Sequence, residues 1–287
     1  MKKTKNKVIL IILDGYGEGK KYKGNAVYLS NPKHIKKYRK EYPMTLLQTS
    51  GEAVGLPQGY MGGSEVGHFT IGAGRVVFQS LEEINRKIRS GDFFKNKELL
   101  GAFKNVKKNK SKLHLMGMIS DEGVHSHLKH LFACLDLAKK QGVKKVYIHA
   151  ITDGRDVPER SADKFIKKIN SKIKKLGIGN IATICGRYYA MDRDKNWKRT
   201  EKAYKLLTEG KGFEEKPITG STSGSPLKAI QNAYKRGDET DYYIQPIILN
   251  QEGFIEKNDS IVFFNYRTDR AKQLTQAFVG RNFKKLK

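Results

Sequence analysis

Ser64 is the residue whose setting most suggests covalent chemistry. It follows Gly62 and Gly63 and precedes a segment that can begin a helix. Glycine permits a tight turn and a close approach of backbone to a ligand, and a helix N-terminus suits a bound phosphate. A serine hydroxyl placed there can attack phosphorus if its pKa is lowered. The same residues also fit a plain turn in which Ser64 caps the helix, so the rest of the chain has to decide.

Four further polar segments each follow a run of residues typical of a buried strand. They are residues 120–127, 152–156, 186–194 and 265–270. In an open α/β sheet the carboxyl ends of parallel strands converge on one crevice. That crevice would collect five arginines, namely Arg155, Arg187, Arg193, Arg267 and Arg270.

These arginines indicate an anionic ligand. The guanidinium group is a fixed fork that pairs bidentately with phosphate or carboxylate. Several such charges in a small volume repel one another unless an anion lies among them. The alternative is that each arginine forms a local ion pair with the aspartate beside it. Because all of them follow strands at equivalent positions, the pattern favours the anionic ligand.

Two histidines and an aspartate belong to the same segments. His125 and His127 form a His-x-His pair, which occurs in metal sites, but residues two apart on a helix point to different faces. We therefore expect His125 to contact phosphate or carboxylate and His127 to be structural or supporting. Asp156, placed among arginines, should have a lowered pKa. It could position a substrate hydroxyl or relay its proton.

Asp14 is the candidate metal ligand. It follows the apolar run of residues 8–13, which reads as a buried strand, and the end of such a strand is a common place for a ligand or metal. A simple turn aspartate is the alternative. Taken together, the residues predict transfer of a phosphoryl group through Ser64, with a metal held partly by Asp14.

The elements that must position these residues alternate between strand and helix patterns, which predicts an α/β fold with a largely parallel sheet. A shift from glycine-rich to amphipathic sequence places a domain boundary near Val77. Before it we expect strands at residues 8–13 and 45–49 and a helix at 32–42. After it we expect strands at 113–119, 145–151, 181–185, 242–249 and 260–265, helices at 81–89, 98–108, 126–140, 161–176, 195–208 and 270–279, and a flexible loop at 220–225.

Composition is that of a folded protein. The chain has 287 residues, of which 38% are hydrophobic and 10% aromatic, so it can bury a substantial core. Its longest apolar run is too short to cross a bilayer and no secretory signal follows the basic N-terminus, so we expect a cytoplasmic protein. Cys134 and Cys185 are far apart, which makes a disulfide framework unlikely.

The charge is strongly positive. A formal net charge of +27 suggests nucleic acid or another polyanion. Much of the lysine alternates with apolar residues on expected helices, as in residues 165–175, which is typical of a solvated helix face. Without an RNA-binding aromatic motif, zinc finger or basic tail, the charge does not predict a specific nucleic-acid partner.

In family order, six motifs resemble the cofactor-independent (2,3-bisphosphoglycerate-independent) phosphoglycerate mutases. They are residues 13–17, 61–68, 120–127, 153–156, 186–194 and 265–270, and the resemblance runs from about Val8 to the end. It implies an isomerase of glycolysis that interconverts 3-phosphoglycerate and 2-phosphoglycerate. The serine matching Ser64 takes the phosphoryl group and returns it to the other hydroxyl, with two manganese ions and no bisphosphoglycerate. A monomer is implied for the full-length protein.

The resemblance also implies residue roles and a domain plan. Asp14 and Ser64 match metal ligands, and the residues that match substrate-binding positions are His125, Arg155, Asp156, Arg187, Arg193, Arg267 and Arg270. Residues 1–77 would be an incomplete alkaline-phosphatase-like domain. Residues 78–287 would be the α/β substrate-binding (transferase) domain inserted into it.

The sequence departs from the family in three ways. Gly63 stands where asparagine is usual and Glu122 where glycine is usual, and family members are considerably longer. The absent segment carries most of the metal ligands, and Asp14 with Ser64 cannot hold two ions alone. We therefore expect an N-terminal fragment that is inactive alone and that a second polypeptide, supplying the C-terminal segment, could rescue. Two other hypotheses are a phosphomonoesterase of the same superfamily and a non-catalytic phosphate- or polyanion-binding module.

Overall fold

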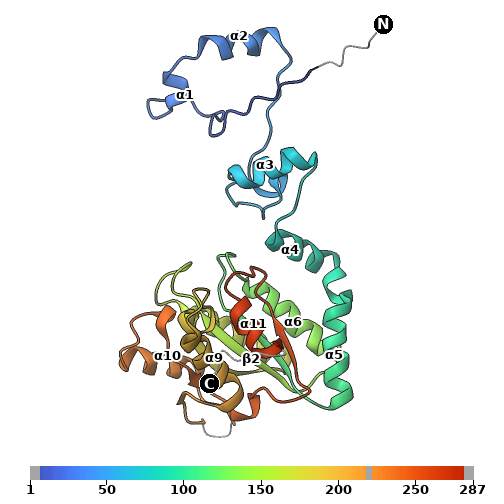
Figure 1. Ribbon diagram of the computed structural model, residues 1–287, viewed down its shortest axis with the longest axis vertical. Coiled ribbons are helices and arrows are strands. Elements are labelled where there is room, and N and C mark those ends of the chain that lie inside the picture. Colours follow the sequence, from blue (N-terminus) through green and yellow to red (C-terminus); the bar gives the residue numbers. More distant parts are fainter. Residues whose placement is uncertain (1–6, 218–221, 281–287) are drawn as a thin grey trace. The chain divides into compact units, whose positions relative to one another are not determined.

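The computed structural model describes residues 7–217 and 222–280 of the chain. It divides into two compact units, Met1–Glu82 and Glu83–Lys287, and each is described here by itself. The sequence-based boundary near Val77 lies shortly before the end of the first unit. Figure 1 shows the elements of both units along the chain.

A six-stranded sheet forms the centre of the second unit, in the order β4-β5-β3-β2-β1-β6. The strand β1 pairs in parallel with both β2 and β6, and β2 pairs in parallel with β3. The strand β5 runs antiparallel to its neighbour β3, and β4 pairs in parallel with β5. The carboxyl ends of β1, β2, β3 and β6 therefore lie at one edge. The strand bounds are Leu113–Met118 (β1), Val146–Thr152 (β2), Asn180–Gly186 (β3), Phe213–Glu214 (β4), Ile247–Ile248 (β5) and Ser260–Phe263 (β6).

Helices cover both faces of this sheet (Figure 1). Residues of β1 alternate between them, because successive side chains of a strand point to opposite faces. Leu113 and Leu115 pack in a core cluster with α5, α6, α7 and α10, whereas Met116 and Met118 pack with α9 and α11. The helices of this unit are α5 (Lys97–Asn109), α6 (Leu128–Lys140), α7 (Ala162–Leu176), α8 (Arg187–Ala190), α9 (Trp197–Glu209), α10 (Pro226–Lys235) and α11 (Lys272–Val279). The helix α4 (Ser80–Ser90) spans the boundary between the two units.

Most of the expected elements of this unit form, but the single strand expected at residues 242–249 is wrong. That stretch begins inside a 3-10 turn, Asp241–Tyr243, and only Ile247–Ile248 joins the sheet. The turn is fixed by Asp241, whose Oδ2 accepts hydrogen bonds from the backbone N–H groups of Ser161 (2.7 Å) and Ala162 (2.8 Å) at the start of α7. The need to cap that helix overrides the local strand propensity.

The two strands expected in the first unit are also wrong. Among residues 7–82 none is paired in a strand, and residues 8–13 and 45–49 are irregular. Val8 is 90% exposed and Leu47 is 78% exposed. A strand needs a partner for its backbone N–H and C=O groups, and the described part of this unit offers none. Its elements are α1 (Ala26–Leu29), α2 (Lys33–Glu41), a 3-10 turn (Gly51–Val54) and α3 (Ser64–Ala73).

Two sequence expectations concern exposed segments. The flexible loop at 220–225 lies partly outside the described residues, which exclude 218–221. The lysine-rich helix α7 buries Phe165, Ile166 and Ile169 and leaves its lysines toward solvent, as the alternation predicted. Within the described ranges, no helix is both long and apolar enough to cross a membrane.

Gly186, at the end of β3, lies against the backbone of the turn at residues 241–243. A Cβ built there would lie 2.4 Å from the carbonyl oxygen of Tyr242. We expect Gly186→Ala to lower the free energy of unfolding by about 1–3 kcal/mol, because backbone on both sides would have to move. Gly101→Ala is the matched control, since a Cβ there meets nothing within 4 Å and alanine favours the helix. Urea denaturation should show no loss for Gly101→Ala, and equal stability of both variants would contradict the prediction.

Candidate anion-binding site

The loops that follow β1 and β6 are tied together at the carboxyl edge of the sheet. The backbone N–H groups of Tyr266 and Arg267 donate to the carbonyl oxygen of His125 (3.0 and 3.3 Å). The side chain of Asn265 accepts a hydrogen bond from the backbone of Met118 at 2.9 Å. The end of β1 thus fixes where the arginine-bearing segment after β6 begins.

Arg187 is a fully enclosed charge of the site. It begins α8 directly after β3, and its side chain is 1% exposed. Its Nη1 donates to Asp153 Oδ1 at 2.6 Å and to Asp156 Oδ2 at 2.7 Å. Asp153 Oδ1 also accepts the backbone N–H groups of Arg155 (3.2 Å) and Asp156 (3.1 Å). One buried carboxylate therefore sets both Arg187 and the loop after β2.

Arg193 and Arg267 meet on a second carboxylate. Asp269 Oδ2 accepts from Arg193 Nη1 at 2.8 Å and from Arg267 Nη2 at 3.2 Å, and its Oδ1 accepts from Arg267 Nε at 3.0 Å. The Nδ1 atom of His125 lies 3.8 Å from Asp269 Oδ1, and its Nε2 lies 4.0 Å from Asp156 Oδ2. His125 therefore lies between the two arginine–carboxylate groups.

Arg270 shows that the arginine charges act on one another. It is buried and donates to the carbonyl oxygen of Met191 at 3.2 Å. Burial lowers its pKa first, and the charges of Arg193, Arg187 and Arg155 lower it further. Arg155 itself is exposed. The structure thus brings the five predicted arginines into one electrostatic neighbourhood at the carboxyl edge of the sheet.

The alternative of purely local ion pairs fits only one of them. Arg267 pairs with its sequence neighbour Asp269, whereas Arg187 and Arg193 reach carboxylates of other loops. Three buried polar atoms of the site, Arg187 Nε, His125 Nδ1 and Asp153 Oδ2, have no hydrogen-bond partner among the described residues. Because an unpaired buried donor or acceptor is costly, these atoms point to a ligand.

The two histidines differ in role. Burial lowers the pKa of His125 to about 4, and the charges of Arg187 and Arg267 contribute, so His125 is neutral near pH 7. His127 lies at the N-terminus of α6, where its ring accepts the backbone N–H of Lys129 at 3.1 Å. That is a structural capping role, as the sequence suggested.

Asp14 and Ser64 lie in the first unit. The helix α3 begins at Ser64 as expected, but its N-cap is Gly63, so the interpretation of Ser64 as the cap is wrong. Gly62 does approach other atoms closely, but these belong to the chain itself, because a Cβ there would lie 1.7 Å from the carbonyl oxygen of Thr49. The approach to a ligand stays a prediction. Asp14 sits exposed in a turn rather than at a strand end, since residues 7–13 form no strand.

A two-metal site does not assemble from the described residues. Asp14 and Ser64 are both exposed, and among the residues of known placement no three His, Cys, Asp or Glu side chains are grouped to hold a metal ion. A catalytic metal needs about three protein ligands. We therefore derive no step through a metal from this chain.

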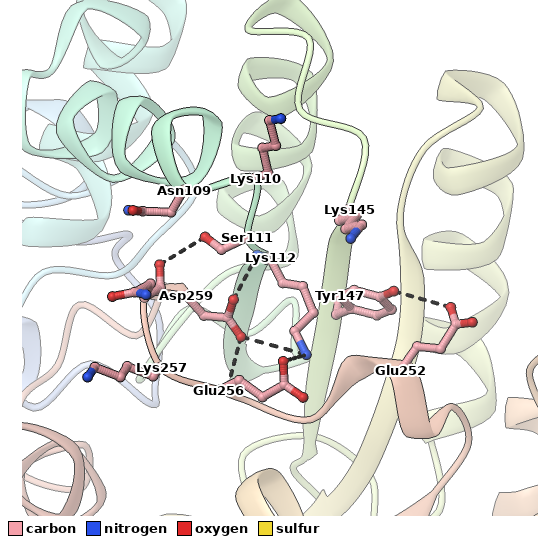
Figure 2. A pocket seen from close by; sticks show the side chains of 11 residues that line it. Asn109, Lys110, Ser111, Lys112, Lys145, Tyr147, Glu252, Glu256, Lys257 and Asp259 are labelled. Carbon is pink, nitrogen blue, oxygen red and sulfur yellow. Dashed lines mark hydrogen bonds and ion pairs between the residues drawn. The ribbon is translucent and has the colours of Figure 1, made fainter.

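A cavity of about 460 Å³ lies at the opposite edge of the sheet, where β1, β2 and β6 begin (Figure 2). Lys112 projects into it and is already engaged, donating to the carbonyl oxygen of Phe254 at 2.7 Å and pairing with Glu256 at 2.9 Å. Figure 2 shows lysines and carboxylates mixed around it. Such a mixture of charges does not single out an anion.

Sequence reasoning missed Asp153 and Asp269, the carboxylates that hold the arginines. Both stand inside the motifs that supplied the arginines, two residues from Arg155 and Arg267 respectively. An aspartate that recurs beside arginines after each strand was the available signal. It could be read only as a local pair, because the partner from another loop is set by tertiary structure.

Fold and site together define an α/β protein with a cluster of arginines and carboxylates at the carboxyl edge of its sheet. Residues 84–287 match the family model described as "BPG-independent PGAM N-terminus". The chain belongs to the 2,3-bisphosphoglycerate-independent phosphoglycerate mutase family.

Named relatives agree. The chain is 49% identical over 280 residues to the 2,3-bisphosphoglycerate-independent phosphoglycerate mutase of Moorella thermoacetica, covering 96% of this chain and 53% of that protein. It is 50% identical to mutase 1 of Methanosarcina barkeri, covering 99% and 54%. A crystal structure of Leishmania mexicana phosphoglycerate mutase at low cobalt concentration matches with a TM-score of 0.71 and 30% identity, covering 95% of this chain and 51% of that one. The chain therefore spans about half the length of these relatives.

The pairing of Arg187 with Asp153 predicts a strong energetic coupling. Arg187→Met leaves a buried carboxylate uncompensated, so we expect a loss of about 3–5 kcal/mol in unfolding free energy. The double variant Arg187→Met with Asp153→Asn should lose less than the sum of the two single variants. Urea denaturation of the four proteins measures the coupling, and strict additivity would contradict it.

The buried histidines predict loss of stability in acid. Burial lowers the pKa of His130 from 6.5 to about 3, so between these values the unfolded chain binds more protons than the folded one. Stability should therefore fall as pH drops from 6.5, by up to about 1.4 kcal/mol per pH unit for such a histidine. Urea denaturation from pH 7.5 to 4.5 tests this. His130→Gln should give a shallower pH dependence and the exposed-residue variant His34→Gln the wild-type one, whereas identical slopes for all three would refute it.

Proposed function

We propose that this chain supplies the nucleophile and the substrate-binding domain of a phosphoglycerate mutase that interconverts 3-phosphoglycerate and 2-phosphoglycerate in glycolysis. The proposal rests on the family and on the names of relatives at about 50% identity. The observation that carries it is the cluster of arginines at the carboxyl edge of the sheet, with the buried nitrogens of Arg187 and His125 unpartnered among the described residues. A phosphorylated carboxylic acid offers both anionic groups that such a crevice can bind.

The roles follow the family resemblance. The Ser64 hydroxyl attacks phosphorus, forming the serine–phosphorus bond while the bond from phosphorus to the substrate oxygen breaks. The glycerate then reorients, and its other hydroxyl takes the phosphoryl group back, which regenerates Ser64. Arg155, Arg187, Arg193, Arg267 and Arg270 hold the phosphate and carboxylate charges, His125 acts as a neutral polar contact, and Asp156 positions a hydroxyl or relays its proton.

The first unit exposes apolar residues that a further polypeptide segment could cover. Val8, Ile9, Leu47 and Met61 are large apolar residues with most of their surface exposed, and an apolar surface of that kind marks an interaction site. We infer that it is covered by a segment equivalent to the part of the relatives that this chain does not span. The remaining metal ligands would come from the same segment, around an alkaline-phosphatase-like domain to which residues 1–77 contribute.

We propose that the metal ions are manganese. The relatives are named as independent of 2,3-bisphosphoglycerate, and the Leishmania mexicana structure was determined at low cobalt concentration. The resemblance favours two manganese ions, with Asp14 and Ser64 as the ligands from this chain. A cytoplasmic location and a monomeric full-length protein are proposed on the same resemblance.

A complementation assay tests the mutase proposal. We expect the 287-residue chain with manganese and 3-phosphoglycerate to give no detectable 2-phosphoglycerate. Adding the portion of the Moorella thermoacetica relative that this chain does not span should restore turnover. Ser64→Ala should abolish it, because the phosphoryl acceptor is gone, whereas Ser30→Ala, at an exposed serine of the same unit, should leave it unchanged. Turnover that survives Ser64→Ala would rule out the phosphoserine route.

Phosphate release in the same assay, together with ligand-binding measurements, separates two competing functions. Release of inorganic phosphate without 2-phosphoglycerate would indicate a phosphomonoesterase that uses the same serine. A purely polyanion-binding module would bind RNA and 3-phosphoglycerate through overall charge alone. Arg267→Ala should then weaken both ligands no more than Arg160→Ala, a change of equal charge outside the crevice. We expect instead that Arg267→Ala selectively weakens 3-phosphoglycerate.

A further inference from the structure

Asp269 occupies an unusual position between arginines of two different loops. Arg193 follows β3 and Arg267 follows β6, and both donate to the same carboxylate at 2.8–3.2 Å. Each guanidinium is therefore within hydrogen-bond reach of one small group. Without a negative charge between them, two such cations would repel and move apart.

Both guanidiniums keep donors that Asp269 does not use. Arg193 gives it only Nη1, and Arg267 gives it Nε and one hydrogen of Nη2. A guanidinium has five N–H donors in a rigid plane, so fixing one edge also fixes where the other edge points. The side chains of Arg193 and Arg267 are 44% and 47% exposed, so their remaining donors face a region that solvent, and hence an anion, can enter.

The charge state of Asp269 suits a permanent contact. Burial alone would raise its pKa, but the hydrogen bond from Arg193 and the charge of Arg267 outweigh burial and lower it. The carboxylate is therefore ionised throughout the neutral range.

We propose that Asp269 is a positioning residue, which clamps Arg193 and Arg267 into a single fork for one anionic group of the substrate. The inference rests on the proposed function for the identity of that substrate, a phosphorylated carboxylic acid. It assigns to Asp269 no contact with the reacting atoms. The opposing possibility is that Asp269 competes with the ligand for the two arginines, in which case removing its charge would tighten binding.

Asp121 provides a matched control. It follows β1 at the same edge of the sheet and accepts two lysines, Lys164 at 2.9 Å and Lys168 at 3.1 Å. Its side chain is 32% exposed, against 33% for Asp269. Asp121→Asn therefore removes the same charge from a similar two-cation setting without touching an arginine.

The first experiment measures binding of 3-phosphoglycerate to the full 287-residue chain by titration calorimetry. We expect Asp269→Asn to weaken binding roughly tenfold, since losing a charged hydrogen-bond partner has an effect of that order. Asp269→Glu should recover part of the affinity, and Asp121→Asn should match wild type. In an Arg193→Ala background the effect of Asp269→Asn should shrink, which a general loss of structure would not produce. Unchanged or tighter binding by Asp269→Asn would overturn the inference.

A second measurement does not depend on the substrate. The Nε–H proton of Arg267 should be protected from exchange with water in wild type, because it donates to Asp269, and should lose that protection in Asp269→Asn. NMR of the arginine Nε–H signals reports this directly. Lost protection together with absent 3-phosphoglycerate binding in wild type would keep the clamp and reject the proposed function. Protection that is the same in both proteins would reject the clamp.

Discussion

Repulsion among the arginines is the constraint on which the site depends. Several guanidinium groups can share the carboxyl edge of one sheet only if negative charges separate them. Asp153 and Asp269 provide that separation from the loops after β2 and β6. Each contacts more than one element, so the charges are held in a defined array and not simply neutralised in pairs.

The parallel register of the sheet makes this array possible. The strands β1, β2, β3 and β6 run in the same direction, so their loops emerge together. Apolar side chains on both faces of β1 hold the strand between two helical layers. The tertiary hydrogen bonds from the β6 loop to the carbonyl of His125 then join loops that are distant in sequence. The packed core thus determines where the strands end, and the loops that begin there determine where the arginines and aspartates lie.

The elements that depend on local sequence alone were predicted correctly. Runs of residues typical of buried strands, with helix patterns between them, predicted β1, β2, β3 and β6, and the polar segments that follow these strands contain the arginines. Prediction from local sequence was wrong where a strand needs a neighbouring strand. Residues 8–13 have the composition of a buried strand but are irregular and exposed. The strand predicted at residues 242–249 does not form over its full length, because Asp241 accepts a hydrogen bond at the start of α7. The roles of Asp153 and Asp269 depend on contacts between loops, which no single segment contains.

The two edges of the sheet show why charge satisfaction identifies the site better than cavity size does. The cavity at the starting edge is about 460 Å³, yet its enclosed cation, Lys112, already has a carbonyl and a carboxylate as partners. At the carboxyl edge, Arg187 is equally engaged through Nη1, but its Nε is buried and unpartnered among the described residues. A buried charge with one donor left over has lost its water without full replacement. Lys112 already has an anionic partner in Glu256, whereas the buried Nε of Arg187 has no partner among the described residues.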